Sequence, residues 1–159
     1  MNFKIARTRT HTRTAAALAT LATAFTLLTT AHAADDPLKS AAAEKGAVVS
    51  ETGLVFLSLR DGKGASPVAT DTVKVHYRGT FTDGREFDSS YKRGEPTSFP
   101  LNRVIKCWTE GVQKIKVGGM AKLTCPSAIA YGEKGAGGGE IPGGATLVFE
   151  IELLAVNGK

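Results

Sequence analysis

The clearest alternation of hydrophobic and polar residues lies at residues 72–81. Its hydrophobic positions, together with one glycine, are Val73, Val75, Tyr77, Gly79 and Phe81. The positions between them are polar or charged: Lys74, His76, Arg78 and Thr80. A period of two predicts a strand with one buried and one wet face, as in an antiparallel sheet. The Asp83-Gly84 pair predicts a hairpin turn into a returning strand at residues 85–90.

Three other segments have the pattern of strands. Residues 53–60 and 146–156 alternate in the same way, and the β-prone residues 121–125 end at Pro126. The segment at residues 146–156 directs its large apolar side chains to one face: Leu147, Phe149, Ile151 and Leu153. The connections are hairpin-like, so we expect one antiparallel sheet of five strands.

One short helix is predicted after residue 102. Asn102 is placed to act as its N-cap. The apolar residues that follow are spaced as one helical face: Val104, Ile105, Trp108, Val112 and Ile115. Gly118-Gly119 ends the pattern. Because so short a helix is unstable alone, we expect the sheet to cover it, which makes the fold class α+β.

The N-terminal segment predicts export. Residues 1–13 carry four basic residues and no acidic one, residues 15–28 are rich in Ala, Leu and Thr, and Ala31-His32-Ala33 fits a cleavage site. This pattern predicts a signal peptide at residues 1–33. A transmembrane anchor is the alternative, but it needs about 20 apolar residues, so no membrane span is expected after cleavage. The mature protein is then periplasmic or secreted.

Removal of the signal peptide changes the charge argument. The whole chain has 20 basic and 15 acidic residues, and loss of the four basic residues of the signal leaves a net charge of only +1. This balance gives no reason to expect nucleic acid or anionic lipid as a partner. The mature length suits one domain, with a flexible lead-in at residues 34–52 and a folded domain at residues 53–157.

The sequence offers little conventional catalytic chemistry. Cys107 and Cys125 are the only cysteines, and a pair in an exported protein favours a disulfide, with two buried thiols as the alternative. His76 is the only histidine of the mature chain and has no ligand cluster around it, so no metal is expected. A nucleophile–base arrangement is also missing from the pattern.

Aromatic residues at strand ends and in loops are the more informative feature. They are Tyr77, Phe87, Phe99, Trp108, Tyr131 and Phe149. Each alone suits a core, but together with Asp88 and Arg93 they indicate an aromatic-walled pocket with few polar groups. The glycine-rich residues 133–145 lack a Gly-Lys-Ser/Thr sequence, which favours a mobile surface flap over a phosphate-binding loop.

Several motifs resemble those of the FKBP-type peptidyl-prolyl cis-trans isomerases. They are Val-His-Tyr-Arg-Gly, Asp-Gly-Arg-Glu-Phe-Asp-Ser-Ser, Phe-x-Leu-Asn-x-Val-Ile-x-x-Trp-x-Glu-Gly, Ala-Tyr-Gly and Ile-Pro-x-x-Ala-Thr-Leu-Val-Phe. They occur in family order over residues 53–156. The resemblance is to small exported bacterial members related to the macrophage-infectivity-potentiator type. It implies a five-stranded antiparallel sheet curled around one short α-helix.

The resemblance also implies a set of site residues. Trp108 would form the floor of a proline pocket, with Asp88 at its edge oriented by Tyr77 and Arg93, and with Ile141 reaching in from the flap. The implied walls are Tyr77, Phe87, Phe99, Val104, Ile105 and Phe149. The backbone N–H of Ile105 and the hydroxyl of Tyr131 would hold substrate carbonyls. The residues that act in catalysis would be Tyr77, Phe87, Asp88 and Tyr131.

The implied activity is isomerisation of X-Pro bonds during the folding of exported proteins, without a cofactor. Expected ligands are proline-containing peptides, unfolded exported proteins and the macrolides tacrolimus and rapamycin, and we expect a monomer. The alternative is a peptide-binding chaperone or virulence-associated binding module with little or incidental turnover. Cys107, Cys125 and Glu140 depart from the residues common in the family, and Glu140 could alter which residue is accepted before proline.

Overall fold

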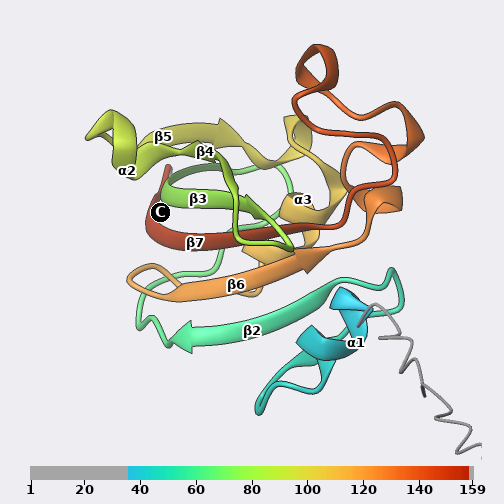
Figure 1. Ribbon diagram of the computed structural model, residues 1–159. Helices are drawn as coiled ribbons and strands as arrows, with labels where there is room; N and C mark the ends of the chain where they lie inside the picture. The colour runs from blue at the N-terminus through green and yellow to red at the C-terminus, as the bar shows by residue number, and fades with distance from the viewer. Residues whose placement is uncertain (1–35, 158–159) are drawn as a thin grey trace, which may run out of the picture. The chain divides into compact units, whose positions relative to one another are not determined.

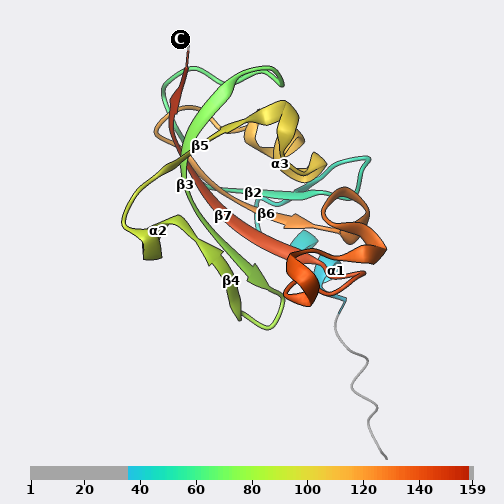
Figure 2. The ribbon, with the colours of Figure 1, turned by 90° about the horizontal axis from the view of Figure 1, so that it is seen from above.

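A computed structural model describes residues 36–157, so the predicted signal peptide lies outside the described residues. Figures 1 and 2 show an antiparallel sheet with a helix on each face. The helices are α1 (Pro37–Ala42), α2 (Ser90–Arg93) and α3 (Lys106–Val112). The strands are β1 (Val48–Val49), β2 (Val55–Arg60), β3 (Thr72–Phe81), β4 (Glu86–Ser89), β5 (Thr97–Pro100), β6 (Met120–Cys125) and β7 (Leu147–Val156). Short 3₁₀ helices are η1 (Leu101–Arg103), η2 (Ser127–Ile129), η3 (Gly132–Lys134) and η4 (Gly137–Gly139).

The sheet confirms the α+β class and all five predicted strands. Its strand order is β1-β2-β6-β7-β3-β4, and β5 also pairs with β3. The alternation predicted for residues 72–81 is present as burial of every second side chain of β3. The strand count of five was wrong, because β1 and β5 bring it to seven. These two strands are short, and their pairing depends on neighbours distant in the sequence.

Two strands share one edge of β3 and leave a gap between them. β5 pairs with residues 72–75 and β4 with residues 78–80. At Tyr77 the partner is instead the hydroxyl of Ser90, which accepts the Tyr77 backbone N–H at 2.8 Å and donates to the Tyr77 carbonyl at 3.2 Å. Ser90 is fully buried, so this side chain satisfies backbone groups that water does not reach.

The predicted helix differs from the observed one. Residues 101–103 form η1, and Val104 is extended (φ −107°, ψ 177°) before α3 begins at Lys106. Asn102 is therefore not the N-cap of α3: Ile105 occupies that position, without a side-chain cap. The break removes Val104 and Ile105 from the helical face and leaves both half-buried. The later residues of the predicted face, Trp108, Val112 and Ile115, are buried.

Helix α3 packs against β6. The predicted disulfide is confirmed: Cys107 on α3 is bonded to Cys125 at the end of β6, with Cα atoms 5.9 Å apart, and both residues are fully buried. Gly111 permits the close approach, since a Cβ there would lie 2.5 Å from the Leu123 side chain. The disulfide and this contact hold the start of α3 in place against the sheet.

The lead-in at residues 34–52 is more ordered than its composition predicts. Asp36 caps α1 by accepting the Leu38 backbone N–H at 3.0 Å. Figure 2 shows α1 on the face of the sheet opposite α3, where Glu44 forms an ion pair with Lys122 of β6 at 2.6 Å. The segment expected to be flexible thus contains a helix, α1, and a strand, β1, which pairs with β2 at the edge of the sheet.

Candidate active site

The tryptophan of α3 forms the floor of a ring-lined pocket. Three aromatic rings meet Trp108 nearly edge-on. Their centroids lie 5.1 Å (Tyr77), 5.5 Å (Phe99) and 5.5 Å (Phe149) from the Trp108 centroid, and the angles between the ring planes are 81°, 87° and 89°. Edge-to-face contacts of this kind are the favourable geometry for aromatic pairs. The buried indole N–H of Trp108 has no hydrogen-bond partner among the described residues.

The pocket has a volume of about 310 Å³ and is walled mainly by apolar side chains. Nine of the eleven residues expected at the site line it: Tyr77, Phe87, Asp88, Phe99, Val104, Ile105, Trp108, Tyr131 and Phe149. Residues far apart in the sequence meet here because strands β3, β5 and β7 converge on Trp108 of α3. The predicted roles of these residues are not decided by their position and stay predictions.

Gly79 lets Phe87 lie across β3. A Cβ at Gly79 would come within 2.7 Å of the Phe87 ring and 3.0 Å of the Phe149 ring. Phe87 meets Phe149 edge-on, with ring centroids 5.7 Å apart. The glycine at a buried-face position of the β3 pattern thus makes room for one wall of the pocket.

A polar cluster closes one side of the pocket. The Tyr77 hydroxyl donates to Asp88 Oδ2 at 2.5 Å, and Arg93 donates to Asp88 Oδ1 at 2.6 Å and to the Tyr77 hydroxyl oxygen at 2.8 Å. Asp88 lies on β4 and Arg93 ends α2, the short helix whose first residue is Ser90. By binding the Tyr77 backbone, the Ser90 hydroxyl therefore helps to hold the side chains of Tyr77, Asp88 and Arg93 in position relative to one another.

The cluster sets the protonation states at the pocket edge. Burial alone would raise the pKa of Asp88, but hydrogen bonds from Tyr77 and Arg93 and the charge of Arg93 outweigh it and lower that pKa. Burial, followed by the hydrogen bond to Asp88, raises the pKa of Tyr77. At neutral pH Asp88 is therefore an anion whose two oxygens are occupied, and Tyr77 is a neutral donor.

Two hydrogen-bond donors at the rim are open. Among the described residues, neither the Tyr131 hydroxyl nor the Ile105 backbone N–H has an acceptor. Tyr131 is 38% exposed, and burial, with the charge of Asp88 second, raises the pKa of its hydroxyl. Both groups can therefore donate to carbonyl oxygens of a bound peptide at neutral pH.

Three residues differ from the expected lining. Arg93 lies behind Asp88 and Tyr77 and does not line the pocket, and Ile141 is buried in the core cluster, 7% exposed. The segment that carries Ile141 is built of 3₁₀ turns and is closed by a bridge between Ala136 and Ile141.

Arg103 lines the pocket, although it was not predicted from the sequence as a site residue. Its position directly before Val104 and Ile105 was the only sequence signal that could have pointed to it.

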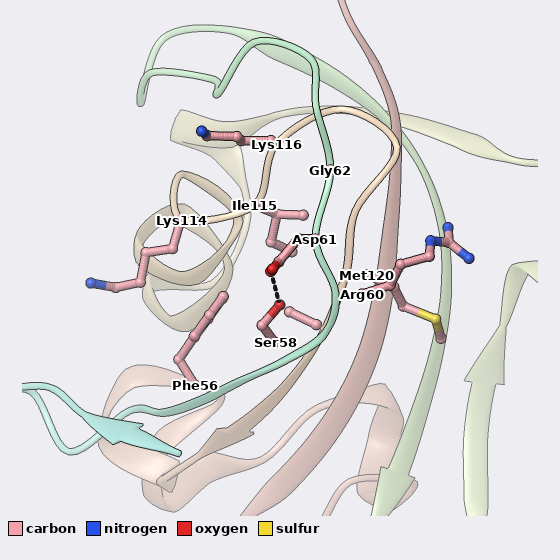
Figure 3. A pocket seen from close by; sticks show the side chains of 10 residues that line it. Phe56, Ser58, Arg60, Asp61, Gly62, Lys114, Ile115, Lys116 and Met120 are labelled. Atoms are coloured by element: carbon pink, nitrogen blue, oxygen red, sulfur yellow. Dashed lines mark hydrogen bonds between the residues drawn. The ribbon is translucent and has the colours of Figure 1, made fainter. Parts of the chain in front are cut away.

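A second hollow, of about 270 Å³, lies between the end of β2 and the segment after α3 (Figure 3). Asp61 and Ser58 are bonded to each other there at 2.7 Å, and Lys114 and Lys116 extend away from them. The remaining lining residues are Phe56, Arg60, Gly62, Ile115, Met120 and Ala121. This hollow has no cluster of rings.

In the described part of the chain, the only carboxylate that lines the aromatic pocket is Asp88, and both of its oxygens already accept hydrogen bonds, so no free general base lines it. His76 points from the other face of β3, where it stacks on Tyr91 with centroids 4.6 Å apart and lies 3.0 Å from the Ser90 hydroxyl. Within residues 36–157 there is also no group of acidic, histidine and cysteine side chains placed to hold a metal ion. Fold and site define a protein with an apolar, ring-lined pocket and open hydrogen-bond donors at its rim.

Comparisons with known proteins agree with this description. Residues 63–154 match the sequence model of the FKBP-type peptidyl-prolyl cis-trans isomerases. The chain is 53% identical over 122 residues to the FKBP-type isomerase FkpA of Aeromonas hydrophila, covering 77% of this chain and 45% of the relative. The FkpA of Escherichia coli K12 is 54% identical over 115 residues, which cover 72% of this chain and 42% of the relative. This chain therefore belongs to the FKBP-type peptidyl-prolyl cis-trans isomerase family.

Solved structures lead to the same family. The crystal structure of FkpA from Escherichia coli matches with a TM-score of 0.72 and 52% identity, covering 75% of this chain and 55% of that one. A peptidyl-prolyl cis-trans isomerase of Pseudomonas syringae matches with a TM-score of 0.70 and 38% identity, covering 76% of this chain and 87% of that one. The chain spans less than half the length of the curated relatives described above. None of the helices within residues 36–157 has the length and apolar character needed to cross a membrane.

Proposed function

We propose that this protein is a peptidyl-prolyl cis-trans isomerase that acts on X-Pro bonds of exported proteins during folding. The observation that carries the proposal is the Trp108 floor with Tyr77, Phe99 and Phe149 set edge-on around it. A proline ring is apolar and compact enough to lie on such a floor. Uncatalysed X-Pro isomerisation takes tens to hundreds of seconds, slow enough to limit folding.

The walls supply the physical basis of catalysis. Rotation about a peptide bond has a barrier of ~18–20 kcal/mol because resonance makes the C–N bond partly double. Resonance also separates charge between oxygen and nitrogen, and water stabilises that charge. The twisted amide has lost the charge separation, so replacing water by rings favours it over the planar amide. This mechanism requires neither a nucleophile nor a general base.

Hydrogen bonds at the rim complete the mechanism. A million-fold acceleration requires about 8 kcal/mol, and desolvation alone is too small a source. The open donors of Ile105 and Tyr131 would hold substrate carbonyls, so that the chain on each side of the proline is kept in a turn. We assign Tyr77, Phe87 and Asp88 to the edge around the rotating bond.

An isomerisation assay on residues 34–159 tests the proposal. Exchange spectroscopy of a blocked peptide Ala-Leu-Pro-Phe measures cis-trans interconversion directly by NMR. We expect the protein to accelerate the exchange, and tacrolimus or rapamycin to block it by occupying the pocket. Tight peptide binding without acceleration would overturn the enzymatic proposal and favour the binding module instead. Acceleration that persists at saturating drug would overturn the assignment of the pocket.

The export pattern at residues 1–33 supports a periplasmic or secreted location, where unfolded exported proteins are the substrates. Fractionation of cells that express the whole chain tests this, with N-terminal sequencing of the mature protein to locate the cleavage site. Recovery of the uncleaved chain in the cytoplasm would contradict it.

The proposed monomer is tested by light scattering coupled to size-exclusion chromatography.

A further inference from the structure

Arg103 is the pocket residue whose charge is not balanced. Of the residues that line the pocket, only Asp88 and Arg103 are charged. Asp88 has both carboxylate oxygens occupied, by Tyr77 and by Arg93. Arg103 is exposed, and no hydrogen bond or ion pair is seen for it within residues 36–157. The rim therefore presents one unpaired cation to whatever enters the pocket.

The backbone under Arg103 is held in place. Arg103 ends η1, whose first residue, Leu101, is fully buried and donates its backbone N–H to the Asp71 carbonyl at 2.9 Å. The Thr109 hydroxyl donates to the Leu101 carbonyl at 2.6 Å and so ties η1 to α3. The backbone that carries Arg103 is therefore tied to α3, the helix that carries Trp108.

The chemistry of a guanidinium determines what it would select. Arginine is charged at every physiological pH, and its planar donors match a carboxylate in a two-point contact. With a proline ring on Trp108, the residues beside the proline must lie at the rim, because the rings occupy the floor and walls. A carboxylate there would meet Arg103, whereas a lysine would be repelled.

We propose that Arg103 is a specificity-determining residue that selects substrates with Asp or Glu next to the proline. The inference rests on the proposed isomerase function and names the substrate class of that site. The selected chemistry is a side-chain carboxylate, on the residue either before or after the proline. The Arg103 side chain acts on selection of the peptide and takes no part in rotation of the bond.

Blocked peptides without terminal charges test the proposal. One series, Ala-Xaa-Pro-Phe, varies the residue before proline among Glu, Gln and Lys, and a second series, Ala-Leu-Pro-Xaa, varies the residue after it in the same way. In one of the two series we expect a kcat/KM for Glu about threefold above that for Gln, the size of a single exposed ion pair, with Lys below Gln. The preference should shrink in about 0.5 M NaCl, because salt screens exposed charges.

Variants assign the preference to its residue. Arg103→Ala should bring the Glu to Gln ratio to about one, and Arg103→Glu should invert it. Lys106→Ala is the matched control, since Lys106 is an exposed cation three residues away that does not line the pocket, and it should keep the wild-type ratio. Circular dichroism and rapamycin binding show that each variant is folded with its pocket intact.

The outcomes separate this inference from the proposed function. A wild-type ratio of one in both series, or a preference that survives Arg103→Ala, would overturn the role of Arg103 while leaving the isomerase in place. Failure to accelerate exchange of any peptide, neutral ones included, would overturn the proposed function itself. A ratio lost in Arg103→Ala and kept in Lys106→Ala supports the inference.

Discussion

The two hollows of this domain are similar in volume, about 310 and 270 Å³, and differ in their walls. The first is floored by Trp108 and walled by rings from four strands, β3, β4, β5 and β7. The second is lined mainly by charged and aliphatic side chains with one ring, Phe56, and its Asp61 and Ser58 are bonded to each other. The proposed mechanism needs the first environment, because its cluster of rings can replace the water around a twisted amide, and the second hollow has no such cluster.

The two hollows also differ in how their parts are held. The disulfide to β6 holds α3 in place directly beside Trp108, and Ser90 fixes the β3 backbone at Tyr77. The other hollow lies beside the turn at residues 113–119, where backbone hydrogen bonds such as Gly64 N–H to the Val117 carbonyl at 3.0 Å hold loop to loop. Volume alone therefore does not identify a site, whereas apolar walls on a fixed backbone do.

The largest effect should come from the floor of the aromatic pocket. Trp108→Ala is expected to lower kcat/KM at least about hundredfold, which corresponds to about 2.7 kcal/mol of lost transition-state binding. It should also cost about 3–5 kcal/mol of stability, so Trp108→Leu is measured beside it to keep apolar volume. Phe56→Ala in the other hollow should leave kcat/KM within about twofold. Equal losses in the two hollows would remove the distinction between them.

Loss of the disulfide should change stability and spare activity. Cys107 and Cys125 are separated by 18 positions, and a closed loop of this size stabilises by about 3 kcal/mol in the chain-entropy model. The double variant Cys107→Ser/Cys125→Ser is expected to lose about this much in urea unfolding. Its kcat/KM at room temperature should remain near that of the wild type, since neither cysteine lines the aromatic pocket. A large loss of activity in the folded variant would contradict this.

Removal of the Ser90 hydroxyl tests how the backbone of the pocket is held. Ser90→Ala leaves the N–H and the carbonyl of Tyr77 without that partner in a buried place, which should cost about 1–3 kcal/mol in the free energy of unfolding. Ser58→Ala is the matched change in the other hollow. Ser58 is exposed, so its loss should stay within about 0.5 kcal/mol. Similar costs for the two serines would show that the gap in the β3 edge is not structurally important.

Asp88→Ala should have a smaller effect, on activity. It removes the acceptor of both Tyr77 and Arg93, and we expect kcat/KM to fall about tenfold, equivalent to about 1.4 kcal/mol. Asp61→Ala supplies the comparison, because it too removes an aspartate hydrogen-bonded to a hydroxyl, but in the hollow without rings. Unchanged turnover and rapamycin binding in Asp88→Ala would place the aspartate outside the site.

The smallest effect is the acid dependence of Asp88. Its pKa is lowered from the ordinary value of 3.8 in the folded protein, so its stabilising contribution is present above the unfolded pKa and is lost as the pH falls through the folded pKa. The contribution should stay within about 1 kcal/mol because the Asp88–Arg93 pair is exposed. Urea unfolding of wild type and Asp88→Asn between about pH 6 and pH 3 measures it. The two curves should converge at the acid end; a constant difference would contradict the sign.

Periodicity and turn chemistry in the sequence were sufficient for much of this domain. The strand at residues 72–81 has the predicted bounds and the predicted buried face, and Asp83-Gly84 forms the predicted turn, with Gly84 at φ +85°. These features are local, because a period of two and a positive φ are properties of a few neighbouring residues. The aromatic residues of the pocket were also identified from the sequence, through their types and the family motifs.

Tertiary structure alone decided the rest. β5 exists because β3 offers it an edge, and the predicted helix is interrupted at Val104, where that residue and Ile105 line the pocket. Ser90 and Arg103 have no periodic signature: one fills a gap between two strands, and the other reaches the rim from a turn fixed by Leu101. Such roles depend on which residues meet across long sequence separations. Packing of the whole chain determines these contacts, and the local sequence around each residue does not.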